Sequence, residues 1–253
     1  ADFRESRGET ELAVGILERA NQIHCKQSAN VAINLASLLE LQDQYEAALG
    51  ILTSFDSHTV GNLMIYNRYI AILKRREIKY PRMERNEGKS VGEAYESLIR
   101  DGLLPYSSNR VTNAKRITEN TRRSISSYYS MHYARYLRKV KGRTKVAMKV
   151  MKTAIVADPS NEGLYHALID LHYDSIPLDI ESIKDAFEQC INGSKTPLSL
   201  KVRISQWRIE LFEEIGSDPK DIRQFTSIHK ELLMKKKEKD FEPIETNEVK
   251  EEV

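Results

Sequence analysis

The chain has 253 residues, of which 40% are hydrophobic and 30% are charged, and its formal net charge is +2. This near-neutral balance does not mark the whole chain as a nucleic-acid binder, and no uncharged apolar run approaches the roughly 18 residues of a membrane span. Cys25 and Cys190 stand far apart with no CxxC pair, which argues against a disulfide framework or a zinc site and favours a reducing compartment.

Scarce glycine (11) and proline (7) predict long helices, and the first helices of the chain reveal a repeat. Residues 1–17 align with residues 36–52 without a gap, at an offset of 35. Weaker copies follow, each marked by a small residue with an apolar or sulfur side chain four residues later. The small residues are Ala13, Ala48, Ala94, Ala147 and Ala186.

A repeat of this length built from two helices predicts an α-solenoid, in which neighbouring pairs stack to bury their apolar stripes. The alternative is a coincidence of alanine spacing in an ordinary helical bundle. We expect an all-α fold of about six helix pairs in a right-handed superhelical stack. The predicted pairs are 1–7 with 10–24, 29–42 with 44–54, 59–78 with 90–101, 112–141 with 143–157, 161–174 with 179–192, and 197–215 with 219–239.

The domain prediction follows from these pairs. One repeat domain is expected over 1–240, with the first three pairs in 1–101, a linker loop at 102–111 and the last three pairs in 112–240. A further polar insert interrupts the period at 80–90. Residues 241–253 are acidic with little to pack, which is typical of a disordered tail. The opening ADFRESRGET reads as a chain entered in mid-helix, which predicts a fragment.

Enzyme motifs fail on inspection. The GKS at 88–90 lacks the glycine that a phosphate loop needs five residues earlier, where Met83 stands. His166 and Asp170 share a helix face, but His172 points elsewhere, so packed or solvated histidines are favoured over a metal site. We therefore expect no catalytic activity, no cofactor, no metal and no small-molecule substrate.

The middle of the chain is strongly basic. Residues 100–152 hold fourteen Lys or Arg against Asp101 and Glu119 alone, a local charge near +12. Tyr129, Tyr133 and Tyr136 fall on one face of the predicted helix and are expected in the core. The cations form a solvated face, or they contact an acidic protein or, without sequence preference, an RNA backbone. The candidates are Arg122, Arg123, Arg135, Arg138, Lys139, Lys141, Arg143 and Lys145.

The predicted helix at 197–215 contains the only tryptophan and carries two apolar strips. Leu200, Ile204, Trp207, Leu211 and Ile215 form one strip; Leu198, Val202 and Ile209 form the other, with Phe212 between them. One strip packs on the preceding pair. The other packs either on helix 219–239 or on a second chain, and we predict a dimer seam. The candidates are Val202, Ile204, Trp207, Ile209, Leu211, Phe212, Ile215, Phe225, Ile228 and Leu232.

The helical stretches HYARYL (132–137) and AMKVMKTAIVADPSNEGLY (147–165) resemble half-a-TPR (HAT) repeats. The last 120 residues, and most specifically LKVRISQWRIELFEEIGSD (200–218), resemble the C-terminal HAT domain of the pre-mRNA-processing factor 39 family. The tryptophan usual in HAT repeats is missing from most copies here, and Tyr133 and Tyr165 stand in its place.

The resemblance implies a nuclear, non-catalytic splicing scaffold associated with the U1 small nuclear ribonucleoprotein, which supports 5′ splice-site recognition and splice-site choice. It also implies a homodimer or a paralogue heterodimer through the C-terminal repeats, and protein subunits of that particle as partners, with no membrane. The alternatives are a HAT scaffold for 3′-end cleavage or ribosome assembly, a TPR-like peptide-binding adaptor, and a direct RNA-binding module.

Overall fold

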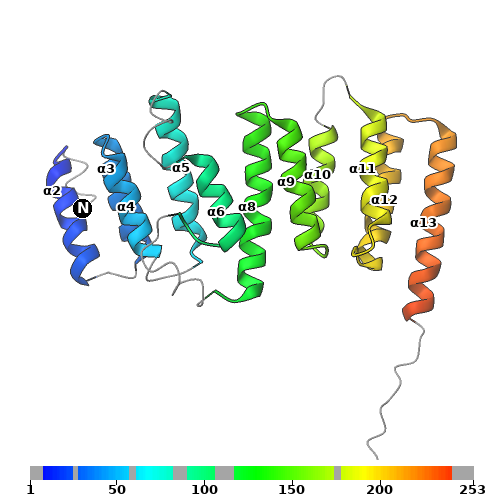
Figure 1. Ribbon diagram of the computed structural model, residues 1–253, viewed down its shortest axis with the longest axis horizontal. Helices are drawn as coiled ribbons and strands as arrows, with labels where there is room; N and C mark the ends of the chain where they lie inside the picture. The colour runs from blue at the N-terminus through cyan, green and yellow to red at the C-terminus, as the bar shows by residue number, and fades with distance from the viewer. Residues whose placement is uncertain are drawn as a thin grey trace, which may run out of the picture. The chain divides into compact units, whose positions relative to one another are not determined.

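A computed structural model describes residues 8–24, 28–56, 61–81, 90–105, 117–173 and 178–240. Every regular element in these ranges is a helix (Figure 1), which confirms the all-α prediction. The predicted helix 1–7, the tail 241–253, Cys25 and most of the insert 80–90 lie outside these ranges. In the ranges described, no helix is long and apolar enough to cross a membrane.

The chain divides into two compact units, residues 1–150 and 151–253. Within the first unit each helix packs against the next, as in an α-solenoid. Its helices are α2 (Thr10–Arg19), a π-helical turn (Ala20–His24), α3 (Ala29–Leu41), α4 (Tyr45–Asp56), α5 (Leu63–Lys79), α6 (Val91–Asp101) and α8 (Glu119–Lys139). The division between the units falls inside α9 (Thr144–Ala157). The predicted single domain over 1–240, the six pairs and the handedness of the stack stay predictions.

The second unit is also a series of neighbouring helices. After the end of α9 come α10 (Glu162–Tyr173), α11 (Ile180–Asn192), α12 (Leu198–Glu214) and α13 (Pro219–Asp240). Contacts run from α10 to α11, from α11 to α12 and, most extensively, from α12 to α13. These ends lie within two residues of the predicted ones, because Asp158-Pro159, Pro197 and Pro219 stop and start helices.

Two predicted helix starts were wrong for a local reason. The helix expected from 59 begins at Leu63, because Asn62 caps it and its side chain accepts a hydrogen bond from the Met64 amide at 3.0 Å. The helix expected from 112 is not continuous, because Thr118 has extended backbone and its hydroxyl accepts from the Thr121 amide at 3.2 Å. In the predicted linker loop, Leu103 and Leu104 are fully buried.

The alanines of the repeat are buried in the helix packing. Ala13, Ala48, Ala94 and Ala147 are completely buried, and Ala186 is 2% exposed. The side chains four residues later are buried with them: Leu17, Leu52, Leu98, Met151 and Cys190. A larger side chain at the alanine position would hold the neighbouring helix away, so the repeat encodes helix spacing.

Tyrosines form much of the core of the first unit. Tyr129, Tyr133 and Tyr136 are buried, as predicted, and Tyr95 stacks on Tyr133 with ring centroids 5.0 Å apart. Burial raises the pKa of the Tyr95 hydroxyl to about 12. The Lys74 ammonium lies 5.4 Å from the centre of the Tyr95 ring, so the ring face replaces part of the hydration shell of the ammonium group. These rings are therefore packing groups and not an exposed platform for bases.

In the second unit, α12 places a cation in the core. Arg208 is 1% exposed, and its guanidinium lies 4.1 Å from the centre of the Phe225 ring. Its Nε and Nη2 atoms are buried without a hydrogen-bond partner, and burial lowers the pKa of the group. The carboxylate of Glu188 offsets only part of this effect. A desolvated cation with unmade hydrogen bonds costs stability.

Replacing Ala48 with leucine should destabilise the first unit, because a larger side chain in a filled helix contact forces strain. We expect Ala48→Leu to lower the free energy of unfolding by about 1–3 kcal/mol in urea denaturation. Ala47 is the matched control, since it is the exposed neighbour on the same helix. Equal effects of Ala47→Leu and Ala48→Leu would contradict this account of the repeat.

Replacing Arg208 with methionine should stabilise the second unit, because methionine keeps the apolar stem and removes the buried charge. We expect Arg208→Met to raise the free energy of unfolding by about 1–3 kcal/mol. Arg203→Met is the control, since Arg203 is 62% exposed and only pairs with Glu162 at 2.9 Å. If Arg208→Met lowered the free energy of unfolding, the Arg208 guanidinium would have hydrogen-bond partners in the folded protein.

Candidate functional site

Five of the ten candidate dimer residues are buried in the interior of the second unit. Val202, Ile204, Phe212, Phe225 and Leu232 are all buried within the chain. Phe212 stands between Phe187 of α11 and Phe225 of α13, with ring centroids 6.1 Å and 5.1 Å away. Helices α12 and α13 also meet through Ser205 and His229, whose Oγ and Nδ1 atoms are 2.7 Å apart. Helices α12 and α13 therefore pack against each other, and Val202 is the buried member of the second strip.

The structure places Trp207 against the preceding helices, whereas the sequence listed it among the candidates for the dimer seam. Its ring lies against the preceding helices, 4.0 Å from the His166 ring of α10 and 5.1 Å from the Phe187 ring of α11. Trp207 thus anchors α12 to the preceding pair and is half-buried there.

The remaining dimer candidates are part-exposed: Ile209, Leu211, Ile215 and Ile228. Leu211 and Ile215 continue the strip of Trp207 at helical spacing, so together they form one apolar ridge at the end of α12. Ile209 lies on the other side of α12 and Ile228 on α13. The ridge of Trp207, Leu211 and Ile215 is therefore the part-exposed portion of the predicted seam that runs along one face of α12.

The eight predicted basic residues fall into two groups. Arg122 and Arg123 lie in the first turn of α8, where Arg122 pairs with Glu119 at 2.7 Å. The other six surround the last turns of α8 and the start of α9, about 24 Å further along the helix. We call them the α8–α9 basic cluster: Arg135, Arg138, Lys139, Lys141, Arg143 and Lys145. Apart from the half-exposed Arg138, they are exposed.

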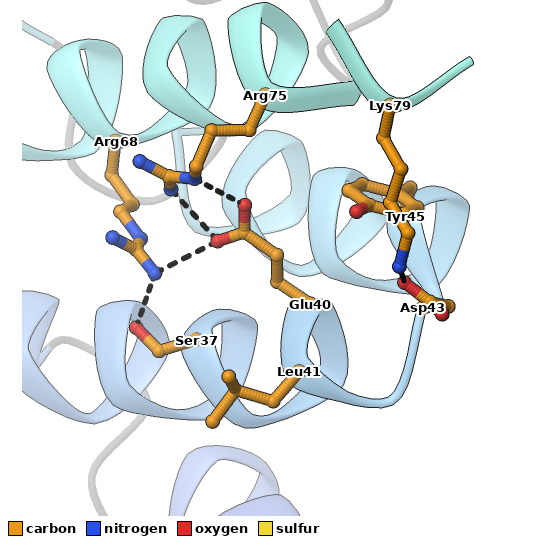
Figure 2. A pocket seen from close by; sticks show the side chains of 8 residues that line it. All are labelled: Ser37, Glu40, Leu41, Asp43, Tyr45, Arg68, Arg75 and Lys79. Atoms are coloured by element: carbon orange, nitrogen blue, oxygen red, sulfur yellow. Dashed lines mark hydrogen bonds and ion pairs between the residues drawn. The ribbon is translucent and has the colours of Figure 1, made fainter.

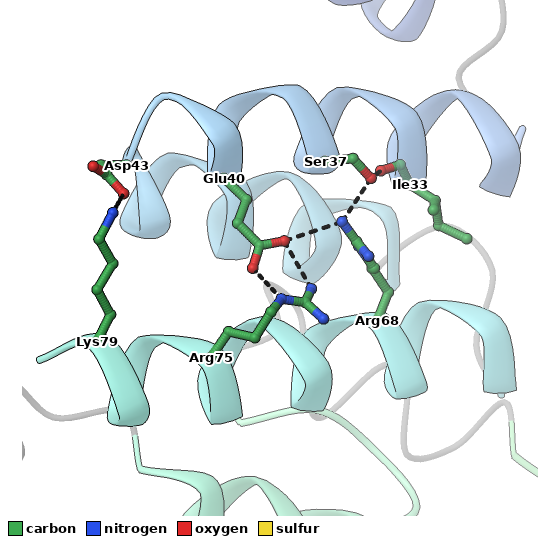
Figure 3. Close-up of polar contacts among 7 residues, drawn as sticks. All are labelled: Ile33, Ser37, Glu40, Asp43, Arg68, Arg75 and Lys79. Carbon is green, nitrogen blue, oxygen red and sulfur yellow. Dashed lines mark hydrogen bonds and ion pairs between the residues drawn. The ribbon is translucent and has the colours of Figure 1, made fainter. Parts of the chain in front are cut away.

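A polar pocket in the first unit was not predicted. It has a volume of about 510 Å³ and lies between the end of α3, the α3–α4 turn and α5 (Figure 2). Arg75 donates from Nε (2.5 Å) and Nη2 (2.8 Å) to the two carboxylate oxygens of Glu40. Arg68 donates from Nη2 to Glu40 at 3.0 Å and to Ser37 at 2.7 Å, so two guanidinium groups share one carboxylate (Figure 3).

Burial and charge act in opposite directions on the two arginines. The hydrogen bonds to Glu40 raise the pKa of Arg75, whereas burial lowers the pKa of Arg68. At the rim, Lys79 pairs with Asp43, and the exposed Leu41 and the ring of Tyr45 form the apolar wall (Figure 2). The sequence did carry a signal for this pocket. Arg68, Arg75 and Lys79 recur at i, i+7 and i+11, which places them on one face of the helix.

A second, more apolar pocket lies in the second unit. It has a volume of about 370 Å³ and is lined by the end of α9 and the loops that follow α9 and α11. The Cys190 thiol at its wall is 3% exposed, and burial raises its pKa to about 12. A thiol held protonated in this way is a poor nucleophile.

The residues inspected for catalysis have structural roles where the structure describes them. Ser90, from the GKS stretch, caps α6: its hydroxyl accepts from the Glu93 amide at 3.1 Å in a capping box. The His166 ring packs against Trp207 at a tilt, and burial lowers the pKa of His172. No group of three metal-binding side chains occurs in the described ranges.

Comparison with known proteins gives one consistent result. No family model matches the chain. Human pre-mRNA-processing factor 39 is 27% identical over 219 residues, covering 86% of this chain and 29% of the human protein. The Xenopus laevis protein of the same name is 28% identical over 221 residues, and the Danio rerio protein is 30% identical over 118 residues, or 46% of this chain.

The chain spans about three tenths of the length of these curated relatives. The match to the human protein covers far more than the last 120 residues that carried the resemblance, and its modest identity extends across most of the helices described above. The chain is therefore similar over most of its length to proteins named pre-mRNA-processing factor 39, the resemblance that its stretch from Leu200 to Asp218 predicted.

Proposed function

We propose that the protein is a non-catalytic scaffold in pre-mRNA splicing. In this proposal it acts in the nucleus, associates with protein subunits of the U1 small nuclear ribonucleoprotein, and supports 5′ splice-site recognition or splice-site choice. The observation that carries the proposal is the match of most of the chain to several relatives that are all named pre-mRNA-processing factor 39.

The form of the molecule supports a scaffold. Each unit is a stack of helices whose interior is filled by side chains, so the helices present extended outer surfaces and loops. Stacks of this kind serve as binding platforms because their surface is large compared with their core. The described residues carry charged and apolar surface features, while His166 packs against Trp207 and Cys190 is buried.

We propose further that the protein pairs with a second copy or with a paralogue through its C-terminal helices. The ridge of Trp207, Leu211 and Ile215 supports this pairing, because it leaves apolar area half-exposed at the end of α12. Aromatic and aliphatic anchors of this kind commonly supply most of the binding energy of an interface. The five buried candidates would then pack beneath the ridge and fix its position, without contacting the partner.

Sequence-independent contact with RNA is the second candidate function. The observation that favours it is the α8–α9 basic cluster, which gathers six cations at the last turns of α8 and the start of α9. Such contact would neutralise phosphates and would weaken steeply as salt increases. Fluorescence anisotropy with a short RNA tests it, and the absence of binding at about 50 mM salt would remove it.

Affinity purification of the tagged protein from a nuclear extract of its own source should enrich the U1 RNA over a tag-only control. Quantitative RNA measurement and mass spectrometry of the eluate provide the readout. Recovery of cleavage factors or pre-ribosomal RNA in place of the U1 particle would assign the protein to another RNA-processing complex. Recovery of chaperones would favour the peptide-binding adaptor.

Charging the α12 ridge should separate a dimer into folded monomers, because burying carboxylates at an apolar seam is unfavourable. We expect wild-type protein to scatter light as a dimer at micromolar concentration and Leu211→Glu with Ile215→Glu to scatter as a monomer. Ile180→Glu is the control, since Ile180 is a similarly exposed aliphatic residue in the first turn of α11. A monomeric wild type at these concentrations would refute the homodimer and leave the splicing role untouched.

A further inference from the structure

Large aliphatic side chains are exposed at one edge of the first unit. Leu41 is 72% exposed, Ile78 is 78% exposed and Val140 is 64% exposed. Each stands at the C-terminal end of a helix, α3, α5 or α8, and these ends lie on the same edge (Figure 1). Ion pairs between them confirm the placement: Lys79 binds Asp43, and Lys141 binds Glu77 at 3.1 Å. We call Leu41, Ile78 and Val140 the aliphatic row.

The polar pocket opens beside this row and has an unbalanced charge. Three cations line it, Arg68, Arg75 and Lys79, against the carboxylates of Glu40 and Asp43, so one positive charge remains. The side chains of Arg75 and Lys79 are 47% and 50% exposed. At the floor, the Nε atom of Arg68 is buried without a hydrogen-bond partner. The pocket can therefore accept one further anionic group.

The bridge through Glu40 also makes the pocket rigid. Glu40 is fixed by three hydrogen bonds from two arginines, and the Arg68 guanidinium is held a second time by Ser37 (Figure 3). Cations that are already positioned lose little conformational entropy when an anion binds. Leu41 and Tyr45 stand at the mouth, so an apolar group next to that anion would be covered (Figure 2).

We propose that this edge binds an extended segment of a partner protein in which acidic and apolar residues alternate. One carboxylate would enter the pocket beside Arg75 and Lys79, and apolar side chains would cover the aliphatic row. Packed helices lie about 8–10 Å apart, so the row is about 20 Å long. An extended chain advances about 3.3 Å per residue, so a segment of about six residues spans it.

A polyanion fits this edge less well than such a segment. A nucleic-acid strand would bring a phosphate charge at every step, whereas the pocket has one unbalanced positive charge beside two carboxylates. Phosphates would also leave Leu41, Ile78 and Val140 in contact with water. This proposal goes beyond the splicing role, because it concerns the polar pocket and a surface outside the α12 ridge. Only at its α8 end, where Val140 stands between Lys139 and Lys141, does the aliphatic row meet the α8–α9 basic cluster.

The test is fluorescence anisotropy with the full chain and a labelled peptide of about eight residues in which glutamates and leucines alternate. We expect saturable binding, which Ile78→Ser weakens about tenfold through loss of one apolar contact. Lys79→Gln should also weaken binding and reduce its dependence on salt. Met234→Ser is the matched control, since Met234 is 64% exposed on α13 and lies outside the row. Far-ultraviolet circular dichroism checks that each variant is folded.

Several results would overturn the proposal. One is binding that does not saturate below about 1 mM peptide. Another is equal binding of the peptide by wild type and Ile78→Ser. A third is equal binding of a peptide in which lysines replace the glutamates. Displacement of the peptide by a short RNA, with sensitivity to Lys79→Gln but not to Ile78→Ser, would assign the edge to nucleic acid. Displacement by excess unlabelled protein would assign it to a second copy.

Discussion

Close approach of neighbouring helices at a buried alanine is the contact on which the rest of the structure depends. Ala13, Ala48, Ala94, Ala147 and Ala186 are all buried, and so is the side chain one turn after each of them. A side chain this small is what permits an adjacent helix to come near. A larger side chain at this position cannot be offset by changes elsewhere, because the narrowest contact sets the distance between the two helices. The aromatic and charged positions can vary between repeats as long as this contact is kept.

Charge then fixes the register of successive helices in the first unit. Glu40, near the end of α3, receives Arg68 and Arg75 from α5, and Glu77, near the end of α5, accepts a hydrogen bond from the Tyr136 hydroxyl of α8 at 2.6 Å. Both carboxylates are mostly buried, at 11% side-chain exposure, so these bonds are stronger than surface pairs. A mostly buried carboxylate therefore links α3 to α5, and a second one links α5 to α8. These links hold the C-terminal ends of the three helices along one edge.

Sequence reasoning recovered the helices, the repeat alanines and the buried tyrosines, because each is encoded by local spacing and by breakers such as Pro159 and Pro219. It left open which neighbour Trp207 contacts, because a helical wheel gives the direction of a side chain but not the helix that lies in that direction. It also missed the Glu40 pocket, although Arg68, Arg75 and Lys79 share a face, because the partner carboxylate is supplied by a different helix. The sequence carries no sign that Arg208 is buried, and only three-dimensional packing reveals that it lies over Phe225.

The packing of Trp207 gives the molecule an internal optical label. The only tryptophan of the chain lies in the second unit, whereas the aromatic core of the first unit is built from tyrosines. Excitation at the red edge of the absorption band therefore reports on residues 151–253 alone. Its emission should be quenched by the imidazole that lies 4.0 Å away and should change when α12 separates from α10. Comparing this signal with circular dichroism, which follows all helices, distinguishes melting of the two units in one unmodified sample.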